Sequence, residues 1–153
     1  MVTTVSRADI DKYIGYEAEP TEWHTITQEQ INQFADCTLD HQYIHVDPER
    51  AKQTPFGTTI AHGFLSLSLL SYFATQYSIV IEGITMAINS GFDKVRFLAP
   101  VKVGSRIRAV AKVAAVAETK PGQFRIQTDV TVEIEGEDTP ALVAEWIGVQ
   151  IVA

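Results

Sequence analysis

The feature that most constrains the fold is a long uncharged run, from Gln53 through Ile81, that contains no Asp, Glu, Lys or Arg. Within it, the stretch AHGFLSLSLLSYFATQ (61–76) has apolar side chains spread around the helical wheel, interrupted mainly by serines. A helix that is apolar on nearly all sides is a buried helix. The sequence therefore predicts one long central helix that the rest of the chain must cover.

The second half of the chain has the pattern of β-strands. In QFRIQTDVTVEIE (123–135) apolar and polar residues alternate, which is typical of an antiparallel strand with one buried and one wet face. Residues 105–118 and 140–153 are similar, and 87–100 is a further candidate in which Gly91 would permit a bulge. The sequence thus predicts an α+β fold with a curved antiparallel sheet around the helix. An exposed edge of that sheet would be covered by dimerisation.

Two helix-start signals precede the uncharged run. Thr27 is a candidate N-cap, with Gln30 three residues later as its capping-box partner. Asp47 is the second candidate, because Pro48 suits the first position of a helix and Glu49 complements its positive end. The first half is therefore expected to contribute short helices.

Length and composition indicate one globular domain spanning residues 1–153, of which 46% are hydrophobic and 20% charged. The net charge of -7 argues against general affinity for nucleic acid or an anionic membrane. Cys37 is the single cysteine, which excludes an intramolecular disulfide and fits a reducing compartment. The N-terminal residues lack an apolar signal core and no stretch is apolar enough to span a membrane, so we expect a cytoplasmic protein.

Titratable side chains gather just before the uncharged run. A carboxylate and an imidazole, here Asp40 and His45 on an expected loop, can together orient and deprotonate a water. On spacing alone, an ordinary loop cap with a half-buried histidine explains the pair more readily. His41 and His45 could also join Asp36 or Asp40 in a zinc site, but no third strong ligand follows at a recognisable interval. We therefore expect no metal.

Gly63 stands at the expected start of the central helix. Its N–H would have no partner within the helix, no side chain would obstruct it, and the helix dipole would favour negative charge nearby. Such a group is a good donor to a developing oxyanion. On local grounds it is equally open that the glycine serves only close packing or a tight entry turn.

The chain resembles the MaoC-like, (R)-specific enoyl-CoA hydratase family, and its NodN-like branch, in the stretches LDHQYIH, ERA and AHGF. Further similarity in TTIAHGF and FDKVRFLAPVKVGSRIR extends the resemblance over most of the chain from about Thr27 onward. The resemblance implies a hotdog fold, in which an antiparallel sheet wraps a long helix, and a protein that works as a dimer.

The resemblance also implies roles for individual residues. Asp40 and His45 fall on the two catalytic positions, and Gly63 falls on the oxyanion-hole glycine at the family's interval from the acid. Ser71 takes the place of a serine that supports the catalytic acid. Gln42 takes the place of the signature asparagine, and its longer amide could still reach the water or His45.

Three functions remain open on this basis. The first is hydration of a trans-2-enoyl thioester to an (R)-3-hydroxyacyl thioester, or the reverse dehydration. The second is a hotdog thioesterase, against which the presence of both Asp40 and His45 argues. The third is a non-catalytic acyl-binding subunit, which stays open because Leu39 and Tyr43 replace the family's glycine and proline.

The implied substrate is an acyl-CoA or acyl-carrier thioester, bound by what we expect to be a homodimer. The implied chemistry needs no metal or redox cofactor, and coenzyme A enters only as part of the substrate. Lys94, Arg96 and Arg106 belong to a group of basic residues that could hold its phosphates. In an alternating strand these residues could equally be charges on the solvated face.

Overall fold

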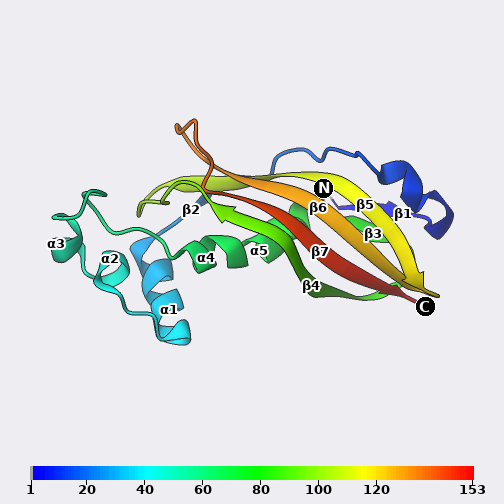
Figure 1. Ribbon diagram of the computed structural model, residues 1–153, viewed down its shortest axis with the longest axis horizontal. Coiled ribbons are helices and arrows are strands. Elements are labelled where there is room, and N and C mark those ends of the chain that lie inside the picture. Colours follow the sequence, from blue (N-terminus) through cyan, green and yellow to red (C-terminus); the bar gives the residue numbers. More distant parts are fainter. Residues whose placement is uncertain (1) are drawn as a thin grey trace.

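The computed structural model describes residues 2–153, and its largest element is a curved five-stranded antiparallel sheet (Figure 1). Its strands, in spatial order, are β2 (His24–Thr25), β5 (Arg106–Lys120), β6 (Gln123–Ile134), β7 (Leu142–Val152) and β4 (Ile84–Phe97). A small parallel sheet pairs β1 (Thr3–Val5) with β3 (Ile79–Ile81). The helices are α1 (Gln28–Thr38), α2 (Tyr43–Val46), α3 (Pro48–Ala51), α4 (Gly63–Ser68), α5 (Leu70–Tyr77) and the 3₁₀ helix η1 (Arg7–Tyr13).

The alternating segments form the long strands, as the sequence predicts. On β6, Phe124, Ile126 and Val130 are buried, and the residues between them are half-buried or exposed. The pairing of β4 with β7 shifts register between Asn89 and Gly91, so the bulge expected beside this glycine is present. The α+β prediction of a curved sheet wrapped around a helix is confirmed.

Helices α4 and α5 lie along the concave face of the sheet (Figure 1). Leu65, Leu70 and Phe73 are buried there, in one cluster with apolar side chains of β5, β6 and β7. Burial of this size supplies the main favourable free energy of folding, since each fully buried side chain contributes about 1.5–3 kcal/mol. None of the helices within residues 2–153 has the length and apolar character needed to cross a membrane.

Two details of the expected central helix are wrong. It is divided at Leu69 into α4 and α5, where the hydroxyl of Ser68 donates to the carbonyl of Phe64 at 2.7 Å. A serine bonded to the preceding turn in this way competes with the helical hydrogen bonds and bends the helix. The helix is also not buried all round, because Phe64 is 68% exposed and Tyr72 is 46% exposed.

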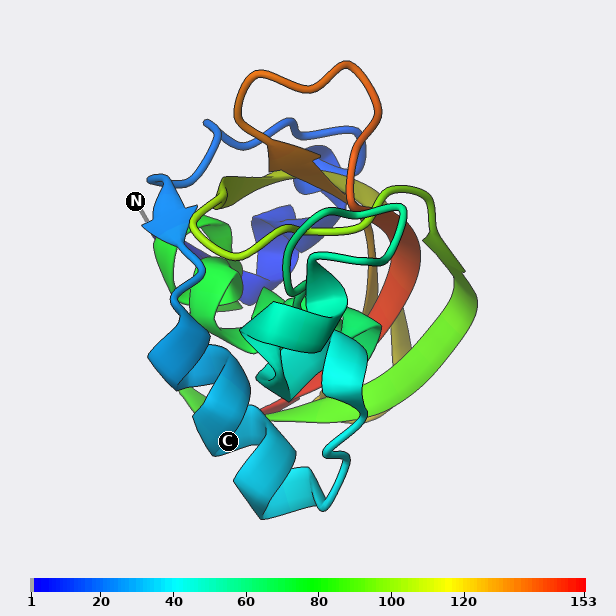
Figure 2. The ribbon, with the colours of Figure 1, turned by 90° about the vertical axis from the view of Figure 1, so that its left-hand side faces the viewer.

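The segment from α1 to α3 follows β2 and precedes α4 in the chain, and it lies beyond one end of the sheet (Figures 1 and 2). Thr27 caps α1 by accepting the N–H of Gln30, as predicted. The Gln30 side chain bonds the His24 ring instead of closing the capping box. Asp47 caps α3 by accepting the N–H of Arg50. These caps fix the first turns of α1 and α3, the two helices that flank the segment containing Asp40 and His45.

Candidate active site

Asp40 lies in the turn between α1 and α2. After α1 ends, Leu39 adopts the left-handed conformation, with φ 65° and ψ 17°. The turn lets the Asp40 carboxylate accept the backbone N–H of Gln42 at 3.3 Å, as in an Asx turn. Leu39 thus holds the backbone angles that a glycine would adopt without steric cost. The departure from the family's glycine leaves the turn in place, at the cost of local strain.

His45 lies in the short helix α2 rather than in a loop, and it is only 7% exposed. Its Nδ1 lies 2.7 Å from the carbonyl oxygen of Ile60. Because a carbonyl oxygen only accepts hydrogen bonds, Nδ1 carries the proton and Nε2 of the neutral ring keeps a lone pair. Burial lowers the pKa of His45, and neighbouring His62 lowers it further, against the opposing effects of the Ile60 carbonyl and Asp40. The site therefore favours the neutral, basic ring.

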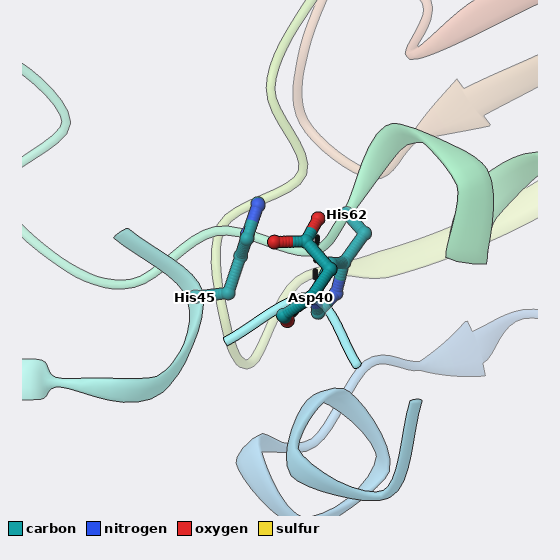
Figure 3. A group of neighbouring side chains, drawn as sticks. All are labelled: Asp40, His45 and His62. Atoms are coloured by element: carbon teal, nitrogen blue, oxygen red, sulfur yellow. Dashed lines mark hydrogen bonds and ion pairs between the residues drawn. The ribbon is translucent and has the colours of Figure 1, made fainter. Parts of the chain in front are cut away.

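His62, the residue before Gly63, completes the cluster (Figure 3). Its ring stacks on that of His45, with centroids 3.8 Å apart and planes 22° from parallel. Its Nε2 is 3.0 Å from the backbone oxygen of Asp40 and 4.0 Å from a carboxylate oxygen of the same residue. Each of the three residues offers an atom within 4.8 Å of the others. The structure therefore brings Asp40 and His45 together, as expected from the sequence.

The three side chains are ligand types that zinc uses, but the orientation of the rings does not suit a shared ion. The planes of the two stacked rings are 22° from parallel and their centroids are 3.8 Å apart, so the in-plane lone pairs lie in two separate, nearly parallel planes instead of converging on one point. One nitrogen of His45 and one of His62 are also bonded to backbone carbonyls. The arrangement fits proton transfer by a carboxylate and an imidazole better than tetrahedral coordination.

Gly63 is the first residue of α4, and His62 is its N-cap. No hydrogen bond joins the Gly63 N–H to another residue in the described chain, and the glycine is exposed. A Cβ added here would lie 3.1 Å from two carbons of the Phe97 ring. The position combines a donor that is unpaired in the described chain with close approach of an aromatic side chain, directly after the His62 that contacts His45 and Asp40.

Of the two supporting residues expected, Gln42 lies next to the cluster. It is the N-cap of α2 and is held by its backbone N–H to Asp40, while its amide makes no hydrogen bond within the described residues. Ser71 lies on α5, in the wall of a cavity, and the described chain contains no hydrogen bond from it to Asp40. No hydrogen bond in the described residues therefore supports a role for Ser71 in positioning Asp40 of the same chain.

The basic residues fall into two groups. Arg106 bonds Glu135 at 3.2 Å, so it is paired across the sheet. Lys94 and Arg96 lie on β4, exposed and without a carboxylate partner in the described residues. They alternate with Val95, which packs against the core, so they point to the outer face of the sheet. They do not converge with the Asp40 cluster within this chain.

A cavity of about 310 Å³ lies between α5 and the concave face of the sheet. Ser71, Ala74 and Tyr77 line it from the helix, and Thr128 and Trp146 from the strands. The hydroxyl of Tyr77 and the indole N–H of Trp146 are buried without a hydrogen-bond partner in the described chain. Burial raises the pKa of Tyr77, so its hydroxyl stays protonated. The cavity is mainly apolar with a few polar groups, as ligand sites usually are.

Sequence reasoning missed Gln28 and Thr59, which support the backbone of His45 through hydrogen bonds. The Gln28 amide donates to the carbonyl of His45 at 2.7 Å and accepts from the hydroxyl of Thr59, which is fully buried. His62 was also missed except as part of the AHGF match. A histidine directly before a helix-opening glycine, with Asp40 and His45 upstream, is the signal that could have identified it.

Comparison with known proteins agrees with this geometry. A family model described as MaoC like domain matches residues 9–135. The 3-hydroxyacyl-thioester dehydratase Z of Mycobacterium tuberculosis (strain ATCC 25618 / H37Rv) is 50% identical over 147 residues, covering 96% of this chain and 97% of the relative. Nodulation protein N of Rhizobium leguminosarum bv. viciae is 49% identical over 145 residues, covering 94% of this chain and 89% of the relative.

Among solved structures, the (R)-hydratase from A. caviae involved in PHA biosynthesis superposes with a TM-score of 0.72 at 25% identity. The match covers 88% of this chain and 94% of that one. This similarity, together with the curved antiparallel sheet and its central helix, confirms the hotdog architecture expected from the sequence. Because the family model spans most of the chain and close relatives match it nearly end to end, the protein belongs to the MaoC-like domain family.

Proposed function

We propose that this protein is a hydro-lyase that adds water across the trans-2 double bond of an enoyl thioester, giving an (R)-3-hydroxyacyl thioester, and that catalyses the reverse dehydration. The observation that carries the proposal is that Asp40 lies within 4.8 Å of a buried His45, whose Nδ1 is bonded to Ile60 and whose Nε2 keeps the lone pair that can accept a proton. The relatives named as a 3-hydroxyacyl-thioester dehydratase and an (R)-hydratase support the same reaction.

The reaction needs one proton taken from water and one delivered to carbon. His45 Nε2 accepts a proton from a water held beside Asp40, while the water oxygen forms its bond to C3. The electron pair of the double bond moves toward the thioester carbonyl, and the Asp40–His45 pair returns a proton to C2. One water is added and nothing is oxidised, so we expect no metal or redox cofactor.

The thioester carbonyl oxygen gains negative charge as the water adds. The Gly63 N–H is the candidate donor to this oxygen, because it is unpaired and adjoins the residue that stacks on His45. One such donor lowers the barrier by about 3 kcal/mol. Gln42, at the start of α2, is the candidate to orient the water, since its amide makes no hydrogen bond within the described residues.

The acyl chain would occupy the cavity beside α5. Ser71 lies eight residues after Gly63, and at a helical rise of 1.5 Å per residue this is roughly 12 Å along the axis. If the thioester carbonyl lies at the Gly63 N–H and the acyl chain runs along the helix, the first carbons of the acyl chain would lie outside the cavity. Only the later carbons would therefore enter it. We expect enoyl thioesters longer than crotonyl to be the better substrates.

The protein would act as a homodimer joined along β4. This strand is an edge of the large sheet, and an unpaired edge is prone to pair with another chain. Large apolar side chains are exposed on it, namely Met86, Ile88, Phe92 and Phe97, and the exposed Phe64 lies against Phe97. A sedimentation mass near 16.9 kDa, that of one chain, would contradict this assembly.

Lys94 and Arg96 are candidates for the phosphates of coenzyme A, because their charges are unpaired within the described chain. Arg106 is the weaker candidate, since Glu135 already neutralises it. The free thiol of Cys37 suits a reducing compartment, and we place the enzyme in the cytoplasm.

The function is tested with purified protein and trans-2-enoyl-CoA substrates of two lengths. We expect loss of the enoyl absorbance without release of thiol, and a product with the (R) configuration on chiral analysis. Release of free thiol would instead identify a thioesterase. No change in either signal with both chain lengths would identify a non-catalytic subunit.

A further inference from the structure

His62 is enclosed between two aromatic rings and is only 2% exposed. One face of its ring stacks on His45, with centroids 3.8 Å apart, and Phe34 of α1 lies at 4.9 Å with a tilted ring. Its Nε2 lies 3.0 Å from the backbone oxygen of Asp40. The ring therefore contacts both members of the candidate acid–base pair and ties them to α1.

The hydrogen bonds fix the protonation of this ring. The backbone oxygen of Asp40 only accepts, so Nε2 of His62 carries a proton and donates it. Nδ1 is buried and has no partner in the described chain. A proton on Nδ1 would be buried without an acceptor, so the Nε2–H tautomer is favoured over the Nδ1–H tautomer.

His62 and His45 are thus held in opposite tautomers by two backbone carbonyls. In His45 the bond from Nδ1 to Ile60 leaves Nε2 basic. In His62 the nitrogen nearest Asp40 is already a donor, and the other nitrogen is sealed from solvent. His62 therefore has no nitrogen with which to take a proton from a water, and its effect must act through the residues it holds.

We propose that His62 is a positioning residue for the hydration reaction, whose Nε2–H fixes the Asp40 main chain and thereby sets the carboxylate against Nε2 of His45. The inference rests on the proposed function. The need for such an anchor follows from the turn itself, because Asp40 is exposed and follows the strained, 81% exposed Leu39. The only hydrogen bond that the Asp40 side chain makes in the described chain is to Gln42.

Two substitutions separate the effect of the aromatic ring of His62 from the effect of its N–H donor. His62→Phe keeps an aromatic ring against His45 but removes the N–H, and His62→Gln removes the ring but places an amide donor near the original Nε2. His41→Phe is the matched control, since His41 is an exposed histidine of the same turn that bonds Asp36. Each full-length variant is first checked for folding by circular dichroism and thermal unfolding.

We expect His62→Phe to lower kcat by about tenfold to a hundredfold with little change in KM, because a misplacement near 1 Å costs about that much. His62→Gln should recover most of the loss, and His41→Phe should match the wild type. Wild-type kcat in folded His62→Phe would overturn the proposal. So would a His62→Gln variant no more active than His62→Phe.

A second measurement does not depend on activity. Histidine ¹⁵N NMR of the full-length protein should show the Nδ1–H tautomer for His45 and the Nε2–H tautomer for His62. An Nδ1–H tautomer at His62 would overturn the inference. If the NMR result holds while the wild type hydrates no enoyl thioester, the proposed function fails and the anchoring contact stands.

Discussion

The Nδ1–H of His45 donates to the carbonyl of Ile60 at 2.7 Å, across fifteen residues of sequence. This bond orients the imidazole and leaves Nε2 as its basic nitrogen beside Asp40. A buried ring held in one tautomer meets the main requirement of a general base, which is a lone pair in a fixed place.

The pH dependence of hydration follows from the burial of His45. Its pKa is lowered from 6.5, so the neutral ring persists to a lower pH than that of a free histidine. Because the neutral ring is the active form, kcat/KM should fall as pH is lowered, with a midpoint below 6.5. A pH profile of kcat/KM checks this. A midpoint at or above 6.5 would contradict the assignment of His45 as the base.

The strain at Leu39 should be visible in stability. A non-glycine residue at φ 65° costs about 1–2 kcal/mol, and a glycine avoids this cost but loses more chain entropy on folding. We expect Leu39→Gly to raise the free energy of unfolding by up to about 1 kcal/mol in urea titrations. Leu39→Ala, which keeps a Cβ, is the control and should gain little. A destabilised Leu39→Gly would show that the exposed leucine makes a favourable contact.

The cavity beside α5 should set the preference for acyl chain length. Ala74 lines it, and Ala74→Leu would fill part of its volume. We expect kcat/KM for trans-2-decenoyl-CoA to fall about tenfold, with the value for crotonyl-CoA nearly unchanged. Thr75→Leu is the control, because Thr75 is exposed on the same helix and does not line the cavity. Equal losses on both substrates would argue that the cavity does not hold the chain.

Much of the fold could be predicted because its signals are local. Alternation in residues 123–135 reports directly which face of β6 is buried, and Thr27 and Asp47 signal their helices from neighbouring residues. The break at Leu69 was not predictable. It accompanies the hydrogen bond from the Ser68 hydroxyl to a carbonyl of the preceding turn, and the sequence does not show whether a serine makes this bond. The exposure of apolar side chains on α4 and α5 was also not predictable, because a sequence does not show which apolar side chains the rest of the chain leaves uncovered.

The site was only partly predictable. The resemblance predicted Asp40, His45 and Gly63 as site residues, and the first two lie close together in the structure. The contact of His62 with a backbone oxygen 22 residues away is one that no side-chain pattern reveals. The pairing of Arg106 was hidden for a similar reason. Arg106 meets Glu135 only because β5 and β6 pair in one register, a contact decided by the fold and not by local composition.

The most direct test of the central claim is the rate of trans-2-enoyl-CoA hydration by folded Asp40→Asn and His45→Gln. Both substitutions keep the approximate shape of the side chain and remove its acid or base, so kcat should fall by about two orders of magnitude or more. Asp36→Asn, at an exposed carboxylate on α1 that bonds His41, is the matched control and should retain wild-type kcat. Wild-type kcat in either Asp40→Asn or His45→Gln would contradict the account.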